Sequence, residues 1–167
     1  MGPIHFLMID TEMDLGAESD QYAFVKADLA AVDRAATPWV VAAGHRPMYT
    51  SSSTGPFADP RMQVLEPLFL DGNVNLALWG HVHNAQVTCP LNNSSCVGVG
   101  DAPQHAVVGN GGQSTSYFNA SHTAPFLEWS AETYGWWTLD AVGKESLVLT
   151  AYSDVTFEAM YTLEVEA

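Results

Sequence analysis

Residues 39–46 read Trp-Val-Val-Ala-Ala-Gly-His-Arg, and this stretch decides the fold. Its apolar part does not alternate with polar residues, which is typical of a strand buried on both faces of a parallel sheet. Two similar apolar runs lie on either side of it, at residues 4–9 and 75–80. The sequence therefore predicts three buried strands that belong to one sheet.

The segments between these three runs have the periodicity of helices. Ser19 or Asp20 is suited to cap the first helix, and Thr37-Pro38 is expected to end it. A loop rich in Ser, Gly and Pro at 50–60 precedes the second helix. The order strand, helix, strand, helix, strand predicts a βαβαβ unit with a parallel sheet. The apolar positions of the two helices are Tyr22, Val25, Leu29 and Val32, then Val64, Leu65, Leu68 and Phe69.

Beyond residue 84 the pattern changes from buried parallel strands to shorter segments. A polar loop bounded by two cysteines precedes the apolar run 105–109, and a long loop is expected from there to about residue 133. The last third is rich in aromatic and β-branched residues and predicts an antiparallel meander. Its three expected strands are 134–140, 145–152 and 156–165. Neither a repeat nor a linker divides the chain, so one domain is predicted.

Composition excludes several classes of protein. With 47% hydrophobic residues among 167, the chain can fill a core, and disorder of the whole chain is ruled out. The formal net charge of −14 would repel a phosphate backbone, so no nucleic-acid partner is expected. No apolar run approaches the roughly 20 residues that a membrane span needs, and we expect no membrane partner. The first residues also lack the basic region of a signal peptide.

Charged residues make up only 14% of the chain, a low share that is a mild indication of a secreted protein. Glycosylation sequons occur at Asn92, Asn93 and Asn119. Two of them lie between Cys89 and Cys96, which are close enough in sequence to close a short loop by a disulfide. The alternative is that both thiols stay free and the sequons arise by chance. Their coincidence favours an oxidising compartment.

Histidines follow two of the predicted strands. His45 lies in Gly-His-Arg-Pro-Met-Tyr after the second strand, and His81 and His83 lie in Gly-His-Val-His-Asn after the third. Ligands collect beyond the carboxyl ends of parallel strands, and neutral imidazole is the commonest metal ligand. Because His81 and His83 are one residue apart, an extended backbone would point them to opposite sides, toward two adjacent metal ions.

Other polar and aromatic residues have simpler interpretations. His5 and His105 lie in apolar runs and are expected to be hydrogen-bonded core residues, whereas His122 is expected to be solvated. Arg46 suits either a phosphate or a structural ion pair. The acidic residues at 10–14 are expected to form a solvated loop or the N-terminal acidic cluster of a helix. Packing roles are expected for Met48, Tyr49, Trp136 and Trp137.

Three strings of this sequence give a more specific interpretation: WVVAAGHRPMYTSS (39–52), LEPLFLDGNVNLALWGHVHN (65–84) and HAVVGNGGQ (105–113). In order and spacing the chain resembles the second half of a purple acid phosphatase, a dinuclear metallophosphoesterase. The resemblance extends from the first strand to the tail. It implies an α/β/β/α sandwich in which two sheets pack face to face, with residues 1–167 as the C-terminal part of one catalytic domain whose N-terminal half is absent.

The resemblance also implies roles for the histidines. His45 and His81 would bind a divalent ion (Zn, Mn or Fe(II)), and His83 would bind Fe(III), in a dinuclear centre. The other ligands of the family come from GDxG, GDxxY and GNH(D/E) motifs, none of which occurs here. Asn84-Ala85-Gln86-Val87 also departs from the Tyr-Glu-Arg string of many relatives.

The function implied is hydrolysis of small phosphate monoesters by a secreted, vacuolar or lysosomal acid phosphatase. Because hard Fe(III) prefers oxygen donors, and these are missing, little or no turnover is expected from this chain alone. The alternative is a non-catalytic paralogue in which the histidines persist in a scaffold or a weak metal-binding module. An uncovered sheet face is expected to cause poor solubility or a homodimer.

Overall fold

The three buried strands predicted from the sequence lie side by side in a parallel arrangement. They are β1 (Ile4–Ile9), β2 (Trp39–Gly44) and β3 (Leu76–Trp79). Their register places Ile9 beside Gly44 and Gly44 beside Trp79, so the three strands end at one level. The structure, a computed structural model, describes residues 2–51, 56–119 and 121–166.

The helices between these strands are shorter than expected. Helix α1 (Asp20–Ala30) begins where the Ser19 side chain accepts a hydrogen bond from the Tyr22 amide, and it ends well before Thr37-Pro38. The second predicted helix is two short ones, α2 (Pro60–Gln63) and α3 (Glu66–Asp71). The break has a physical reason, because Pro67 has no amide hydrogen to continue a helix from α2 and is favoured only in the first turn of α3.

Two segments predicted to be loops contain strands. The segment bounded by the cysteines lies in β4 (Ala85–Asn92) and β5 (Ser95–Cys96), which form a hairpin. The supposed long loop before residue 133 includes β7 (Leu127–Ala131), which pairs with β4. The predicted run at 105–109 is β6 (Gln104–Val108), between β3 and β4. Strand β4 could not be predicted from hydrophobic patterning, because its polar residues Gln86 and Thr88 are buried and hydrogen-bonded.

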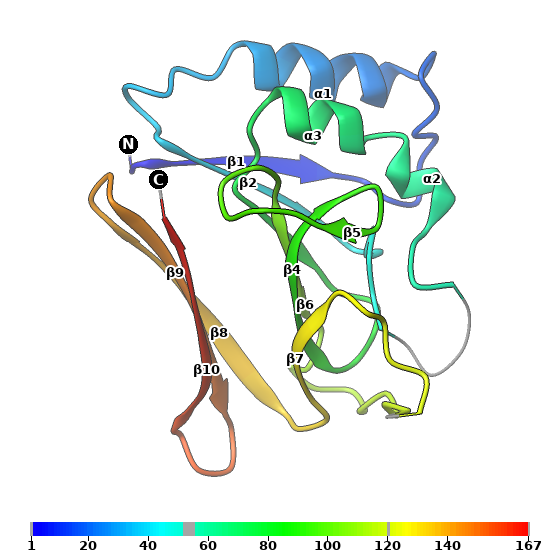
Figure 1. Cartoon of the computed structure of the whole chain (residues 1–167), viewed down its shortest axis with the longest axis vertical. Helices are drawn as coiled ribbons and strands as arrows, with labels where there is room; N and C mark the ends of the chain where they lie inside the picture. The colour runs from blue at the N-terminus through cyan, green and yellow to red at the C-terminus, as the bar shows by residue number, and fades with distance from the viewer. Residues whose placement is uncertain (1, 52–55, 120, 167) are drawn as a thin grey trace.

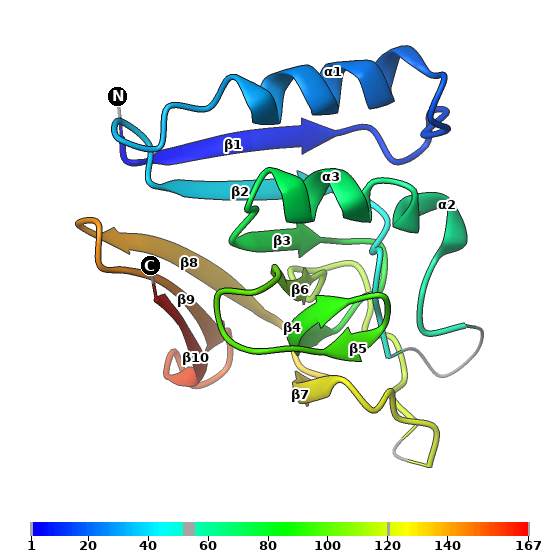
Figure 2. The same ribbon diagram turned by 45° about the horizontal axis from the view of Figure 1, so that its top comes forward.

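The predicted meander is confirmed. It consists of β8 (Gly135–Val142), β9 (Ser146–Ser153) and β10 (Ala159–Glu166), paired in chain order as a separate antiparallel sheet. The seven-stranded sheet has the order β1-β2-β3-β6-β4-β5, with β7 also on β4. Figure 2 shows β1 at one edge of this sheet and β7 at the other.

The helices and the meander pack on opposite faces of the large sheet (Figures 1 and 2). On β2, Val40 and Ala42 face the helical core, whereas Trp39 and Val41 face the core shared with the meander. The described residues thus form three layers, helices, mixed sheet and antiparallel sheet. This arrangement agrees with the predicted α/β class.

Trp136 and Trp137 differ from the expectation that both belong to the core. The Trp137 indole is partly buried and donates to Asn110 Oδ1 at 2.8 Å. Trp136 is 39% exposed and stacks on Tyr152. The two residues differ because neighbouring side chains on a strand point to opposite faces.

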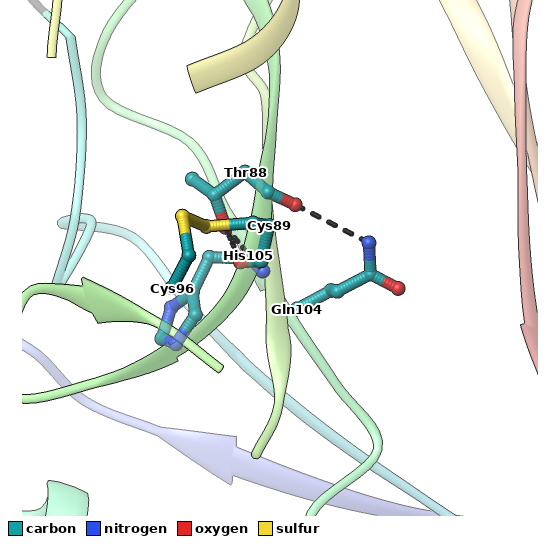
Figure 3. Close-up of a disulfide and its surroundings, with 5 residues drawn as sticks. All are labelled: Thr88, Cys89, Cys96, Gln104 and His105. Carbon is teal, nitrogen blue, oxygen red and sulfur yellow. Dashed lines mark hydrogen bonds between the residues drawn. A yellow bond between two sulfur atoms is a disulfide. The ribbon is translucent and has the colours of Figure 1, made fainter. Parts of the chain in front are cut away.

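A disulfide closes the β4–β5 hairpin. Cys89 and Cys96 are bonded, with their Cα atoms 5.6 Å apart, and no free cysteine remains. Figure 3 shows this disulfide beside Thr88 and His105, where the His105 amide donates to Thr88 Oγ1. The sequence was compatible with either a disulfide or two free thiols, and in the structure the two cysteines form a disulfide.

The same hairpin is also attached to the rest of the molecule by a buried polar pair. The Tyr49 hydroxyl donates to Glu66 Oε1 at 2.5 Å, and both residues are buried. The amide of Ser94 donates to the Tyr49 oxygen, and the amide of Asn93 donates to Glu66 Oε1. Tyr49, from the loop after β2, and Glu66, from helix α3, therefore both bind the turn of the hairpin and fix its position.

Candidate metal centre

The carboxyl ends of β2 and β3 position the first two histidines. Gly44 ends β2, and a Cβ there would lie 2.8 Å from Thr11 Cγ2 and 3.1 Å from Trp79 Cζ3, so only glycine fits without movement. After Trp79, the Gly80 amide donates to the His45 carbonyl oxygen at 2.9 Å. This bond holds the chain that leaves β3 against the chain that leaves β2.

His45 and His81 face each other across these two strand ends. His81 Nδ1 lies 3.1 Å from His45 Nε2, and the rings meet edge to face with centroids 5.0 Å apart. His81 has a φ of 62°, an uncommon conformation for a residue other than glycine. The structure thus brings together two of the three histidines that the sequence analysis selected.

His83 has different neighbours. Its Nδ1 lies 3.1 Å from Ser114 Oγ, and its amide donates to Ser116 Oγ at 3.0 Å. Within residues 2–51, 56–119 and 121–166, no three His, Cys, Asp or Glu side chains gather closely enough to hold a metal ion. Residues 81–84 form bends rather than a strand, so strand alternation does not determine how His81 and His83 point.

Arg46 makes a structural ion pair beside these histidines. Its Nε donates to Glu12 Oε1 at 2.8 Å and to Oε2 at 3.0 Å, while Nη1 lies 3.0 Å from His81 Nε2. The hydrogen bond from Arg46 holds the pKa of Glu12 below its usual value. The sequence predicts Glu12 only as part of an acidic loop or cluster, because nothing in its local pattern indicates a partner 34 residues away.

The proton positions of the histidine pair follow from Arg46. A guanidinium can only donate, so His81 Nε2 accepts from it and the neutral ring carries its hydrogen on Nδ1, toward His45. Desolvation, and next the charge of Arg46, lower the pKa of His81. A neutral ring is the form in which imidazole binds metals.

This donor set fits part of a metal centre. Two imidazoles are suitable ligands for Zn²⁺ or another divalent transition ion, and either nitrogen of His81 would exchange its present partner for the metal. Fe(III) needs hard oxygen donors. The carboxylate of Glu12 lies near these histidines, but it already forms an ion pair with Arg46. The described residues therefore fit a divalent ion incompletely and do not fit a ferric ion.

A pocket of about 510 Å³ opens beside Arg46 and His81. Val82 and Tyr117 also line it, and Tyr117 is 68% exposed. No sequence pattern predicts Tyr117, Ser114 and Ser116 as site residues, since they lie in a polar loop with no periodic signal. Their proximity to the histidines depends on how β6 and β7 bring that loop to the strand ends.

The remaining histidines lie outside the site. His105 is buried and accepts a hydrogen bond from the Trp79 indole at 3.0 Å, as expected of a core residue. His5 is partly buried and bonds Asp28 at 2.7 Å. His122 is exposed and packs on Phe57. Met48 and Tyr49 are buried packing residues, as predicted.

The chain is similar in sequence to known phosphoesterases over the segment that contains β1, β2, β3 and the histidines that follow them. Residues 4–85 match the calcineurin-like phosphoesterase family. The chain is 42% identical over 120 residues to "Probable inactive purple acid phosphatase 9" of Arabidopsis thaliana, a match that covers 68% of this chain and 18% of that protein. It is 30% identical to acid phosphatase A of Cryphonectria parasitica, over 93% of this chain and 35% of the relative.

A solved structure extends the likeness to nearly every element. The purple acid phosphatase PPD1 from yellow lupin (Lupinus luteus) seeds superposes with a TM-score of 0.92 and 28% identity over 99% of this chain, but only 31% of that chain. The present chain thus spans about a third or less of the length of these relatives. With the sequence matches and this shared fold together, the chain is a homologue of the purple acid phosphatases and carries a match to the calcineurin-like phosphoesterase family.

Proposed function

We propose that this chain supplies His45, His81 and His83 to the dinuclear metal centre of an acid phosphatase that hydrolyses small phosphate monoesters. The observation that carries the proposal is the 3.1 Å approach of His81 Nδ1 to His45 Nε2 at the ends of neighbouring parallel strands. The family match supports the phosphoesterase class, and the remaining ligands would come from the length of the relatives that this chain does not span.

The chain's own residues would divide the work as follows. His45 and His81 would hold the divalent ion (Zn, Mn or Fe(II)), and His83, on the other side of Val82, would supply one ligand to Fe(III), whose oxygen ligands would have to come from outside the described residues. The bound metals would supply Lewis acidity toward the phosphate and a water of lowered pKa. Arg46, kept in place by Glu12, borders the pocket and would bind a phosphate oxygen there.

The proposed compartment is secretory or vacuolar (lysosomal in animals). The Cys89–Cys96 disulfide supports an oxidising environment. Asn92, at the end of β4, and Asn93, in the hairpin turn, are exposed, whereas Asn119 is partly buried and accepts a hydrogen bond from the Ser121 amide. We propose Asn92 or Asn93 before Asn119 as the glycosylated residue. In the described part of the chain no helix is long and apolar enough to cross a membrane.

A second candidate function is a non-catalytic scaffold or weak metal-binding module. Two observations favour it: the family relative from Arabidopsis thaliana is itself named probable inactive, and the described residues bring only two histidines together. Under this proposal metal binding would persist without turnover even in a longer polypeptide.

Metal titration tests the proposed centre. We expect the chain to bind one Zn²⁺ or Co²⁺ ion, with His81→Ala weakening the affinity by at least about tenfold because one imidazole donor is lost. His122→Ala is the matched control, since His122 is exposed and lies outside the site. Calorimetry and the Co²⁺ visible spectrum measure both variants. Equal affinity of the His81→Ala variant and the parent chain would contradict the proposal.

Turnover separates the two candidate functions. The chain alone is expected to release no nitrophenol from p-nitrophenyl phosphate, whereas a longer polypeptide that adds the missing carboxylate ligands should do so and lose the activity on His81→Ala. A longer polypeptide that binds metal but stays inactive would support the scaffold instead.

A further inference from the structure

Gln86 is a buried amide on β4, three residues after His83. Its neighbour Val87 packs in the core shared with the meander, and side chains that are adjacent on a strand point to opposite faces. Gln86 therefore lies on the other face of the sheet, toward the loop after β2. It is 1% exposed, so its polar atoms need partners within the protein.

The Gln86 amide uses all of its usual hydrogen-bonding groups. Its Oε1 accepts from the Ser51 amide at 2.7 Å and from the Thr50 hydroxyl at 3.2 Å. Its Nε2 donates to Asn84 Oδ1 at 2.7 Å and to the Ser51 carbonyl oxygen at 3.3 Å. Only an amide offers two donor hydrogens and an acceptor oxygen on one flat group, so a carboxylate could not make this set. Gln86 thus connects residues 50–51 with Asn84.

The first connection leads directly to His83, because Asn84 is the next residue in the chain. Asn84 is fully buried, and its Nδ2 has no hydrogen-bond partner among the described residues. Its side chain is held instead through Oδ1, by Gln86. The Asn84 backbone amide donates to the Val82 carbonyl oxygen at 2.9 Å, which ties together the residues on both sides of His83. A displacement of Asn84 would therefore displace His83.

The second connection passes through Ser51. This residue is buried, and its Oγ accepts from the Ala124 amide at 2.9 Å. Ala124 lies in the segment between β6 and β7, which also contains Ser116. Ser116 binds the backbone of His83 twice, since its Oγ accepts from the His83 amide and its own amide donates to the His83 carbonyl oxygen. The segment that holds His83 is thus itself bound to Ser51, beside Gln86.

The loop that Gln86 binds begins at His45, a proposed ligand of the divalent ion. The Gly80 amide fixes the start of this loop by donating to the His45 carbonyl oxygen. Gln86 fixes the other end, where Thr50 lines the pocket beside the centre. One side chain therefore holds both the loop of His45 and the residue that follows His83.

We propose that Gln86 is a positioning residue, which keeps His83 at a fixed place relative to the loop of His45. The inference rests on the proposed function, in which these two histidines bind two adjacent metal ions. In such centres the ions lie about 3.5–4 Å apart, so the ligands of one ion must be fixed relative to those of the other. Gln86 contacts neither histidine and acts through Asn84 and Ser51.

NMR spectroscopy of the metal-free chain tests the position of His83 without relying on metal binding. Gln86→Met keeps the length of the side chain and removes all four hydrogen bonds. We expect it to shift the imidazole nitrogen signals of His83 and to leave those of the exposed His122 unchanged. Thr88→Val is the matched control, since Thr88 is buried on the same strand and accepts from the His105 amide, away from the centre. This control should lose thermal stability without a shift of the His83 signals.

A Co²⁺ ion adds a readout of distance. When it is bound by His45 and His81, its unpaired electrons shift the NMR signals of His83 by an amount that depends on their separation. Gln86→Met should change this paramagnetic shift, and Thr88→Val should not. If Co²⁺ leaves the signals of His45 and His81 in the parent chain unchanged, the proposed function is wrong. The metal-free spectra then still decide whether Gln86 holds His83.

Ser51→Ala is a milder variant that tests the second connection. It removes the hydroxyl that accepts from Ala124 and leaves the Ser51 backbone bound to Gln86. We expect it to shift the His83 signals less than Gln86→Met, which releases both connections, and it serves as the test if Gln86→Met does not fold. His83 signals that stay in place in every folded variant would overturn the inference. So would signals that move as far in Thr88→Val as in Gln86→Met.

Discussion

Gly109 lies where the chain before β4 passes the end of β6. A Cβ at this position would be 2.1 Å from the Val82 carbonyl oxygen, a contact that requires the backbone to move. Val82 stands between His81 and His83. The absence of a side chain at Gly109 therefore sets how closely the two histidines approach the sheet.

Gly109→Ala is expected to destabilise the protein by about 1–3 kcal/mol and to weaken Zn²⁺ binding, because Val82 and both neighbouring histidines must shift. Gly112→Ala is the matched control, since a Cβ there has no atom within 4 Å. Thermal unfolding and metal titration measure both effects. If the two variants had the same stability and the same Zn²⁺ affinity, the close approach of Gly109 to the Val82 carbonyl would not contribute to either property.

At the residue scale, the sequence predicts the candidate site in part. His45 and His81 are predictable because each follows a buried parallel strand, and parallel strands bring their carboxyl ends together. The contact of Arg46 with Glu12 is not, because it joins two loops 34 residues apart. The environment of His83 depends on Ser114 and Ser116, which have no local signal.

At the scale of elements, the β4–β5 hairpin is held in two independent ways. The disulfide closes it, and the buried Tyr49–Glu66 pair binds its turn to α3 and to the loop after β2. Desolvation, and next the hydrogen bond to Glu66, raise the pKa of Tyr49, which keeps the hydroxyl protonated and donating. The loop after β2, which contains Tyr49, also carries His45 and Arg46.

Tyr49→Phe should lower the free energy of unfolding by about 1–3 kcal/mol, because the buried Glu66 loses one of its two hydrogen-bond donors and keeps only the Asn93 amide. Tyr117→Phe, at an exposed tyrosine, should change stability little. Urea unfolding followed by tryptophan fluorescence compares the two. An effect of Tyr49→Phe no larger than that of Tyr117→Phe would show that the pair does not hold the hairpin.

The elements themselves were predictable where burial was two-sided or alternation was clean. Strands β1, β2, β3 and β6 and the meander follow from apolar and β-branched runs. Strands β4 and β7 do not, because β4 buries polar side chains, of which Thr88 accepts a hydrogen bond from the His105 amide of β6, and β7 contains Glu128 and Ser130. Such strands are stabilised by tertiary hydrogen bonds that no local pattern reports.

At the scale of the whole molecule, His105 makes stability depend on acidity. Burial lowers the pKa of His105 to about 3. Its Nδ1 accepts from Trp79, so the neutral ring carries its hydrogen on Nε2, which has no hydrogen-bond partner among the described residues. Between pH 6.5 and 3 the unfolded chain binds a proton that the folded chain does not, so stability falls as pH falls.

The contribution of His105 to this loss is at most about 1.4 kcal/mol per pH unit below 6.5. His105→Gln should lower the stability at pH 7.5 but flatten its decline between pH 6.5 and 5. His122→Gln, at an exposed histidine, should leave the slope unchanged. Urea titrations across this range measure the slopes. Parallel curves for His105→Gln and the parent chain would contradict the assignment.

The position of β6 has a consequence for the order in which the chain folds. It lies between β3 and β4, yet it comes later in the sequence than both. During synthesis, β4 emerges before the strand that must separate it from β3, so the centre of the sheet cannot close until residue 108 is available. Contacts that wait for distant residues slow folding. The short Cys89–Cys96 loop can meanwhile close first, so that the hairpin is complete before its place in the sheet exists.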